Sequence, residues 1–308
     1  MTYKECYEYG NATLVKAGIE EAAWDARLLL EHVCNTNRND LLVHGDRVVD
    51  LEQTGRYRQF IAKRAERVPL QHLTGVQEFM GLEFNVNEQV LIPRQDTEIL
   101  VEAVLKELHD GMHILDMCTG SGCILISLLH YSNKCKGVGV DISTKALAVA
   151  EKNAQKLLGR CKKEKQSLIK PDEVMQQDMD ASHSMEENAQ ITFVHSNLFE
   201  NVTGKYDIIV SNPPYIRSQV IPTLMPEVKD HEPLQALDGT EDGLFFYRQI
   251  TEESRRYLMK GGMLFFEIGH DQAEDVSSLM EEAGFHNVKV IKDLAGLDRV
   301  VYGDYCKI

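Results

Sequence analysis

Long hydrophobic runs are missing from this chain of 308 residues. A helix needs about 20 mostly apolar residues to cross a bilayer, and no stretch of the sequence approaches that length. The first ten residues, MTYKECYEYG, contain neither a basic leader nor an apolar signal core. We therefore expect a cytoplasmic protein with no membrane partner.

Cysteine is scarce and irregularly placed. The seven cysteines stand at positions 6, 34, 118, 123, 135, 161 and 306, and no two of them form a CxxC pair. An odd number of scattered cysteines predicts neither a disulfide framework nor a zinc site. We expect reduced thiols and no bound metal.

Positively charged residues are also few compared with negatively charged ones. Lys and Arg number 33 against 48 Asp and Glu, which gives a formal charge of −15 at pH 7. Such a chain repels a phosphate backbone unless a local basic patch reverses the field. We therefore expect no direct nucleic-acid partner. The 43% of hydrophobic residues excludes a wholly disordered chain, and the length is typical of two domains.

The first 75 residues have helical periodicity. In EAAWDARLLLEHV, apolar residues recur at three- and four-residue spacing and predict one buried stripe over 22–33. Asp50 is placed to cap a further helix. Trp24 is expected in the core, because tryptophan side chains are mostly buried in folded proteins. Residues 1–75 are therefore predicted to form a small all-helical domain.

The rest of the chain has the pattern of an α/β domain. Residues 76–93, VQEFMGLEFNVNEQVLIP, alternate around Gly81 and predict a β-hairpin linker. Over 94–308, short apolar runs alternate with helical stretches, which predicts a doubly wound parallel sheet covered on both faces. The last two runs, VKVIKDL and RVVYGDY, stand so close that they must pair antiparallel at the sheet edge. Residues 158–190 lack periodicity and are predicted to be a mobile insertion.

A loop of small residues follows the first predicted strand of this domain. The run DMCTGSGCI leads into a helix, whose first N–H groups are available to a nucleotide or a carboxylate. Asp141 ends the next strand, about 20 residues on, where a carboxylate can accept hydrogen bonds from ribose hydroxyls. Together they favour an adenosine ligand over a bare tight turn, without distinguishing NAD from S-adenosylmethionine.

The third strand, ITFVHSN, ends at Asn197 and Leu198. In a doubly wound sheet this end lies beside the adenine, so Asn197 can bond the base edge and Leu198 can cover the base. An Asx-turn with apolar neighbours is the structural alternative.

The fourth strand, YDIIVS, runs into Asn212, Pro213, Pro214 and Tyr215. The prolines fix φ and remove two backbone donors, which leaves a stiff segment whose carbonyls can face a ligand. The Asn212 side-chain oxygen and the Pro213 carbonyl can each accept one N–H of an amide, while Tyr215 can stack on its plane. The segment predicts methylation of a planar amide or amino nitrogen. A strand-ending Asn-Pro turn is the structural alternative.

With these residues together, the chain resembles the bacterial peptide chain release factor glutamine methyltransferases, the PrmC/HemK family, over nearly its whole length. The resemblance rests on the blocks GVQEFMGLEFNVNEQVLIPRQDTEIL, DMCTGSGCI, SNPPYI, EPLQALDGTEDGLFFYRQI, FFEIGHDQ and DLAGLDRVV. Other nitrogen methyltransferases share the NPPY tetrapeptide, so the flanking blocks narrow the substrate.

The resemblance implies a class I methyltransferase sheet of order 3-2-1-4-5-7-6, with the last strand antiparallel, and a substrate-recognising helical domain. The implied enzyme transfers a methyl group from S-adenosylmethionine to the side-chain amide nitrogen of the glutamine in the release factor's GGQ motif. S-adenosylhomocysteine is the implied product, the release factor is the protein partner, and the enzyme acts as a monomer.

The resemblance also implies roles for individual residues. The methionine part of the cofactor is lined by Cys118, Thr119, Gly120, Ser121 and Gly122. Asp141 binds the ribose, Leu198 covers the adenine, and Arg94 helps receive the protein substrate. Asn212 to Tyr215 hold the glutamine, with Asn212, Pro213 and Tyr215 as the catalytic residues and Asn212 also touching the cofactor. The family usually has glycine, aspartate and tryptophan where this chain has Cys118, Asn197 and Leu198.

Four other functions compete with this one. A ribosomal-protein glutamine methyltransferase is close, although the DLAGLDRVV ending favours the release-factor branch. A DNA adenine N6-methyltransferase would need a flipped base and a basic track, which the acidic charge disfavours. An NAD oxidoreductase leaves the NPPY segment without a role. A binding module without turnover is the fourth.

Overall fold

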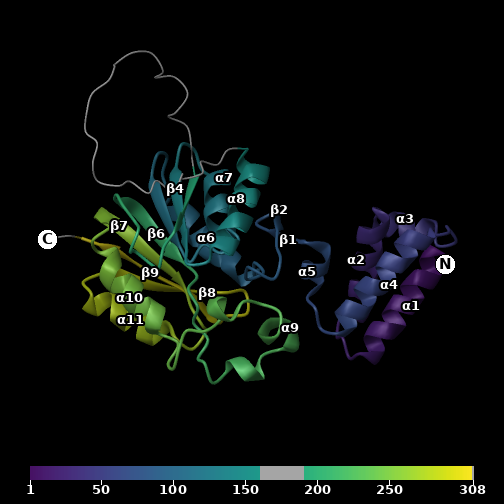
Figure 1. The fold of residues 1–308 in the computed structure, drawn as a ribbon. Coiled ribbons are helices and arrows are strands. Elements are labelled where there is room, and N and C mark those ends of the chain that lie inside the picture. Colours follow the sequence, from purple (N-terminus) through teal and green to yellow (C-terminus); the bar gives the residue numbers. More distant parts are fainter. Residues whose placement is uncertain (160–190, 307–308) are drawn as a thin grey trace, which may run out of the picture.

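The computed structural model describes residues 1–159 and 191–306. The predicted insertion over 158–190 therefore lies outside the described residues from 160 onward. Figure 1 shows a helical bundle at the N-terminal end, set beside a larger body built around a sheet. The bundle contains α1 (Tyr3–Lys16), α2 (Ala22–Cys34), α3 (Arg38–Val43), α4 (Leu51–Ala65) and the short α5 (Leu70–Thr74).

The predicted apolar stripe is the buried face of α2. Its members Ala22, Ala26, Leu29, Leu30 and Val33 are all buried in the helical bundle. Asp50 caps α4 as expected, since its carboxylate accepts from the Gln53 amide at 2.7 Å.

The prediction that Trp24 lies in the core is wrong. Its side chain is 52% exposed, and the Arg27 guanidinium lies 4.3 Å from the ring centroid. The reason is the helical period. Two residues beyond Ala22, a side chain points to the opposite side of α2 from the buried stripe.

The linker contains a hairpin that is shorter than the predicted 76–93. Strands β1 (Val76–Phe79) and β2 (Leu82–Asn85) pair antiparallel. Beyond β2 the chain turns, because the Asn87 side chain accepts from the Gln89 amide at 2.9 Å. The buried rings of Phe79 and Phe84 belong to the core of the sheet domain, so the hairpin is anchored to that domain.

A seven-stranded sheet forms the larger body, in the order β5-β4-β3-β6-β7-β9-β8. Counted from β3, this is the predicted order 3-2-1-4-5-7-6, and β9 is antiparallel to both of its neighbours. The predicted class I methyltransferase sheet is therefore confirmed. The strands are β3 (His113–Met117), β4 (Lys136–Asp141), β5 (Ile191–His195), β6 (Tyr206–Ser211), β7 (Leu258–Glu267), β8 (His286–Lys292) and β9 (Asp298–Tyr305).

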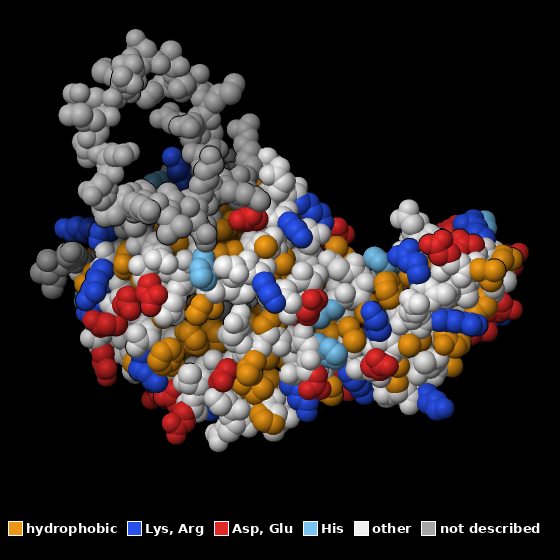
Figure 2. Space-filling view, in the orientation of Figure 1, with side chains coloured by type: hydrophobic (Ala, Val, Ile, Leu, Met, Phe, Trp, Pro, Cys, Tyr) orange, Lys and Arg blue, Asp and Glu red, His pale blue; other side chains and the backbone are white. Residues whose placement is uncertain are grey.

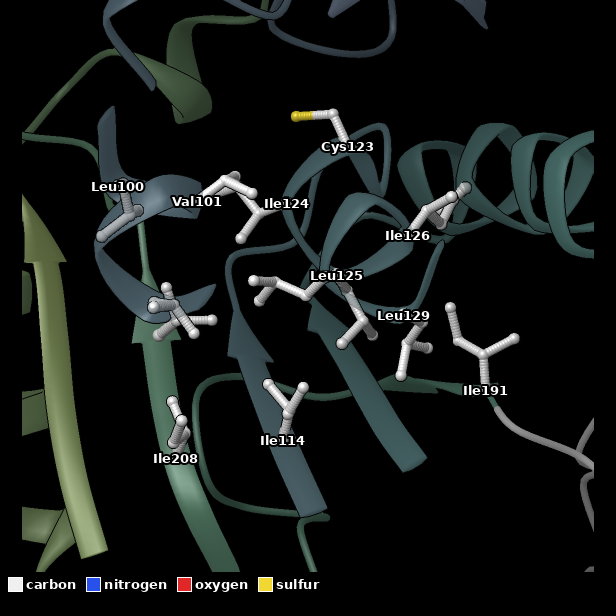
Figure 3. Close-up of a cluster of buried hydrophobic side chains, with 14 of the residues drawn as sticks. Leu100, Val101, Ile114, Cys123, Ile124, Leu125, Ile126, Leu129, Ile191 and Ile208 are labelled. Atoms are coloured by element: carbon white, nitrogen blue, oxygen red, sulfur yellow. The ribbon is translucent and has the colours of Figure 1, made fainter. Parts of the chain in front are cut away.

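Helices cover both faces of the sheet. One buried cluster joins the strands to α6 (Asp96–Glu107), α7 (Cys123–His130) and α8 (Thr144–Leu158), and another joins them to α10 (Phe245–Ser254) and α11 (Ala273–Glu282). In Figure 3, Val101 from α6 and Leu125 from α7 lie above Ile114 and Ile208 of the strands.

A long connection from β6 to α10 contains only short helical pieces, η1 (Ile221–Thr223), α9 (Pro226–Lys229) and η2 (Leu234–Ala236). No helix in the ranges 1–159 and 191–306 is long and apolar enough to cross a membrane.

Candidate cofactor and acceptor site

A cavity of about 1080 Å³ lies at the carboxyl ends of β3, β4, β5 and β6. This is the edge at which open α/β sheets hold their ligands. The structure brings together, in its lining, a subset of the sequence-predicted site residues: Cys118, Gly120, Asp141, Asn197, Leu198, Asn212 and Pro214. The remaining predicted residues do not line it: Thr119, Ser121, Gly122, Pro213 and Tyr215.

Gly120 presents bare backbone to the cavity. Its φ is +56°, and nothing lies within 4 Å of the place that a Cβ would take. A cofactor can therefore approach the main chain closely at this point.

Gly122 has a packing role instead. Its φ is +79°, and a Cβ there would lie 2.9 Å from Ile126 Cδ1 and 3.1 Å from the Cβ of Ala150. The missing side chain lets α7 begin immediately after the loop and lets α8 pack close to it. Thr119 is buried and bonds to Asp116, its hydroxyl donating to the Asp116 carboxylate at 2.5 Å.

Cys118 stands in the left-handed region, with φ of +63°. Residues with a Cβ adopt this conformation at a cost of roughly 1 to 2 kcal/mol. The side chain packs at the edge of the second buried cluster, and burial raises the pKa of its thiol. The chain therefore tolerates a Cβ at this position by accepting backbone strain.

Asp141 ties the loop to the second strand. One carboxylate oxygen accepts from the Gly120 amide at 2.9 Å, and the other accepts from the Ser143 amide at 2.8 Å. Burial raises the pKa of Asp141, while these backbone donors oppose the rise by favouring the charged form. Each oxygen keeps further lone pairs with which to accept from a ribose hydroxyl.

Asn197 and Leu198 lie together where β5 ends. The Asn197 side-chain nitrogen donates to the Glu200 carboxylate at 2.9 Å, and Leu198 has a φ of +48°. A local turn is therefore present at this point, and both side chains also line the cavity. The turn and the ligand-facing position do not exclude each other.

One part of the NPPY segment lines the cavity, and the other part is packed in the protein interior. Asn212 and Pro214 line the cavity, while Pro213 is buried. The Tyr215 carbonyl accepts from Gln272 Nε2 at 3.2 Å, and a Cβ on Gly239 would lie 2.7 Å from Tyr215 Cα. The tyrosine is thus packed against its own domain, and its stacking on an acceptor amide stays a prediction.

Arg94 already has a partner. Its Nη2 lies 2.7 and 2.6 Å from the two carboxylate oxygens of Glu232, whose side chain is buried. Glu232 stands directly before the Pro233–Ala236 stretch of the cavity lining. This ion pair connects Arg94 to this part of the cavity rim, and its role in receiving the protein substrate stays a prediction.

Known proteins match the chain in both of its parts. Residues 5–75 match the family described as the PrmC N-terminal domain, and residues 108–291 match one described as a methyltransferase domain. A Clostridium acetobutylicum protein named release factor glutamine methyltransferase is 39% identical over 90% of this chain and 89% of its own length. A Clostridium botulinum protein of the same name is also 39% identical, over 98% of each chain.

The chain belongs to the release factor glutamine methyltransferase family. It is therefore a methyltransferase, and it uses S-adenosylmethionine. Among solved structures, a methyltransferase from Pyrococcus furiosus is 16% identical, with a TM-score of 0.50, covering 80% of this chain and 100% of that one. This likeness shows the fold.

Sequence reasoning missed the outer wall of the cavity. Residues from three separate segments add to the lining: Glu88 to Leu91 after the hairpin, Pro233 to Ala236 at η2, and Phe245 with Phe246 at the start of α10. Figure 2 shows apolar side chains gathered on the lower part of the larger body, where Figure 1 draws the connection from β6 to α10. The partly exposed Phe245 and Leu234, standing on an irregular connection, were the available signal.

Two buried carboxylates close to the site were also missed. Asp116, in β3, and Glu267, at the end of β7, are both almost inaccessible to solvent. Burial raises the pKa of each to about 7. No cluster of His, Cys, Asp and Glu suited to a metal ion was found in the part of the chain that the structure describes.

Proposed function

We propose that this enzyme transfers the methyl group of S-adenosylmethionine to the side-chain amide nitrogen of the glutamine in the GGQ motif of a peptide chain release factor. The observation that carries the proposal is the position of Asn212 and Pro214 in a cavity that also contains the glycine loop and Asp141. Family membership supports the release factor as the protein substrate.

The residues present fit this cofactor. The open backbone of Gly120 suits its methionine part, Asp141 suits the ribose, and Leu198 suits the adenine. A volume of about 1080 Å³ is at the upper end for ligand pockets, so an acceptor side chain can enter beside the cofactor. When bound, the cofactor supplies an electrophilic methyl group on a sulfonium.

Holding and orienting the acceptor is what the protein itself contributes. An amide nitrogen is a poor nucleophile because its lone pair is delocalised, so its NH2 group has to be held in one orientation. The Asn212 side chain lines the cavity, and its oxygen accepts one N–H, which offsets the positive charge that develops on the nitrogen. The Pro213 carbonyl as the acceptor of the second N–H stays a prediction from the sequence, because Pro213 is not part of the cavity lining. Such positioning supplies up to about 7 to 11 kcal/mol in ideal cases. Deprotonation of the methylated amide by water completes the reaction.

We also propose that residues 1–75 recognise the release factor, that the enzyme acts as a monomer in the cytoplasm, and that it binds no nucleic acid directly. The connection from β6 to α10 supports the first part. It supplies cavity lining at Pro233 to Ala236 and contacts the helical bundle through Glu227. A substrate held by the bundle would therefore stand beside the cavity rim.

A labelling experiment tests the proposed function. The enzyme is incubated with methyl-labelled S-adenosylmethionine and, separately, with a purified release factor, ribosomal proteins and DNA. We expect label on the release factor alone, and none after the GGQ glutamine is replaced. Label on a ribosomal protein or on DNA would point to one of the competing activities instead.

Changing Asn212 tests the role of the NPPY segment. Asn212→Ala removes one preorganised acceptor, so we expect turnover to fall about 10²- to 10³-fold. Affinity for S-adenosylhomocysteine, measured by calorimetry, should stay nearly intact. Turnover close to that of the unchanged enzyme would contradict the proposed chemistry.

A further inference from the structure

Two buried polar side chains lie next to Asn212 and do not line the cavity. Thr97 is in the first turn of α6 and Glu267 ends β7, and both are 2% exposed. The Asn212 Nδ2 donates to the Thr97 hydroxyl at 3.4 Å. One oxygen of Glu267, Oε2, is buried without a hydrogen-bond partner among the described residues. The chemistry described so far uses neither side chain.

The protons in this cluster can be assigned. A hydroxyl has one proton to donate, and an ionised carboxylate can only accept. The Thr97 hydroxyl and the Asn212 amide both interact with Glu267 in a way that favours its charged form. We therefore assign the Thr97 proton to Glu267, whose buried Oε2 has no other partner among the described residues. The lone pair of Thr97 is then left to accept from the Asn212 NH2 group. An amide held in this way has its oxygen pointing away from Thr97.

We propose that Thr97 and Glu267 are positioning residues that fix the Asn212 side-chain amide with its oxygen toward the acceptor glutamine. The inference rests on the proposed function, because it needs Asn212 to accept an N–H of the substrate. The opposite amide orientation would turn an NH2 group toward the NH2 group of the glutamine, and neither could accept.

The charges around Glu267 make this arrangement depend on pH. Arg299 from β9 faces it, but that guanidinium also lies 3.0 Å from Asp293 and 3.2 Å from Asp96. Tyr215 also lies near Glu267, and Arg94 lies near Tyr215. The buried Tyr247 of α10 and Cys123 of α7 face Glu267 as well. One cation close to three carboxylates compensates Glu267 incompletely, and burial raises the pKa of Glu267 to about 7. Once protonated, Glu267 can donate its own proton to the Thr97 hydroxyl. The Thr97 proton no longer has to point toward Glu267, and the arrangement of donors and acceptors that orients the Asn212 amide is lost. Turnover should therefore fall as the pH drops through about 7.

The first test compares two changes at Thr97. Thr97→Val keeps the shape and removes the hydroxyl, whereas Thr97→Ser keeps the hydroxyl. We expect Thr97→Val to lower kcat on release factor about tenfold, as for the loss of one buried hydrogen bond. Thr97→Ser should retain kcat within about twofold of that of the unchanged enzyme. Calorimetry with S-adenosylhomocysteine should give the same Kd for all three proteins, which also verifies folding. Equal kcat values for the two variants would overturn the inference.

The second test uses pH and does not depend on Thr97. Glu267→Gln keeps the size of the side chain and removes its titration. We expect kcat of the unchanged enzyme to rise with pH through about 7, and the Gln variant to have a lower kcat that lacks this rise. An identical acid limb in both proteins would overturn the role of Glu267.

Asn212→Ala distinguishes a failure of this inference from a failure of the proposed function. If Asn212→Ala is impaired while Thr97→Val is not, only the positioning role fails. If Asn212→Ala turns over normally, the proposed function of the NPPY segment fails with it.

Discussion

At the scale of single residues, the site contains one strained backbone position, Cys118, and one carboxylate, Asp141, that accepts hydrogen bonds from two segments. Cys118 keeps a Cβ where the backbone is left-handed. The two oxygens of Asp141 accept from the Gly120 amide of the loop and from the amide of Ser143, the N-cap residue of α8. Both residues stand at strand ends, where the backbone is no longer restrained by the sheet. These are the two positions at which a small chemical change should have the clearest effect.

The strain at Cys118 can be measured directly. Cys118→Gly and Cys118→Ala both remove the thiol, but only the alanine keeps a Cβ at a φ of +63°. We expect the glycine variant to be more stable than the alanine variant by about 1 kcal/mol, because glycine adopts this conformation without steric cost. Urea unfolding of the two variants gives the difference. Equal stabilities would mean that the backbone relaxes around the Cβ.

Replacing one oxygen of Asp141 should weaken cofactor binding. Asp141→Asn places an NH2 group where an oxygen now accepts from either Gly120 or Ser143. We expect affinity for S-adenosylhomocysteine to fall about tenfold or more, since a donor then faces a donor beside the ribose site. Calorimetry measures it. Asp110→Asn serves as the control, because Asp110 is exposed before β3 begins, at the other end of the strand. An unchanged affinity in Asp141→Asn would remove the ribose role.

At the scale of elements, α7 and α8 pack against each other next to the glycine loop that contributes to the cavity lining. A Cβ at Gly122 would meet Ile126 of α7 and Ala150 of α8, and Asn153 of α8 donates to the Ser121 carbonyl at 3.0 Å. The same Asn153 side chain also accepts from the Asn85 amide of β2 at 2.7 Å. One buried amide thus connects the loop, the helix and the hairpin.

Two glycine substitutions separate packing from backbone conformation. Gly122 and Gly159 have similar φ angles, +79° and +71°, but a Cβ meets Ile126 and Ala150 only at Gly122. We expect Gly159→Ala to cost about 1 kcal/mol of unfolding free energy and Gly122→Ala about 2 to 4 kcal/mol, from conformation plus overpacking. Urea unfolding measures both. Similar losses of unfolding free energy in the two variants would show that the packing around Gly122 accommodates an added Cβ at little cost.

At the scale of the whole molecule, a pair of arginines joins the helical bundle to the catalytic domain. Arg64 lies 2.7 Å from the buried Asp25 within the bundle and 3.0 Å from Glu227 on α9. Arg67 reaches the same Glu227 oxygen at 3.3 Å and also bonds to the Gly18 carbonyl. These side chains are mostly shielded from water, which makes their ion pairs less subject to screening than those at an open surface.

This junction should matter for the protein substrate and not for the cofactor. Glu227→Gln removes the charge that both arginines share, and we expect KM for release factor to rise roughly fivefold, equivalent to about 1 kcal/mol. The Kd for S-adenosylhomocysteine should not change. Asp230→Asn is the matched control, because it removes the same charge from the same connection at an exposed position. An equal rise in KM for both variants would show that the loss of one negative charge on this connection causes the effect, and not the loss of the ion pairs at the junction.

Most of the architecture was predictable because it depends on local patterns. The stripe on α2, the cap at Asp50 and the alternation of strands and helices follow from spacings within one element. Trp24 is exposed because the helical period of α2 places it opposite the buried stripe, so the average burial of tryptophan is a poor guide at this position. The hairpin ends before the alternating run does because the Asn87 turn interrupts it.

The sequence by itself determined the alternation of strands and helices and the residues at the strand ends, including Gly120, Asp141 and Asn212, because periodicity and turn chemistry act over a few residues. The sheet order followed from the family resemblance. Only the tertiary structure decided what surrounds them. Thr97 stands 115 residues before Asn212 and became its neighbour only when α6 packed against the end of the sheet. Burial, and with it the raised pKa of Glu267, is a property of packed surfaces and not of any local stretch of chain.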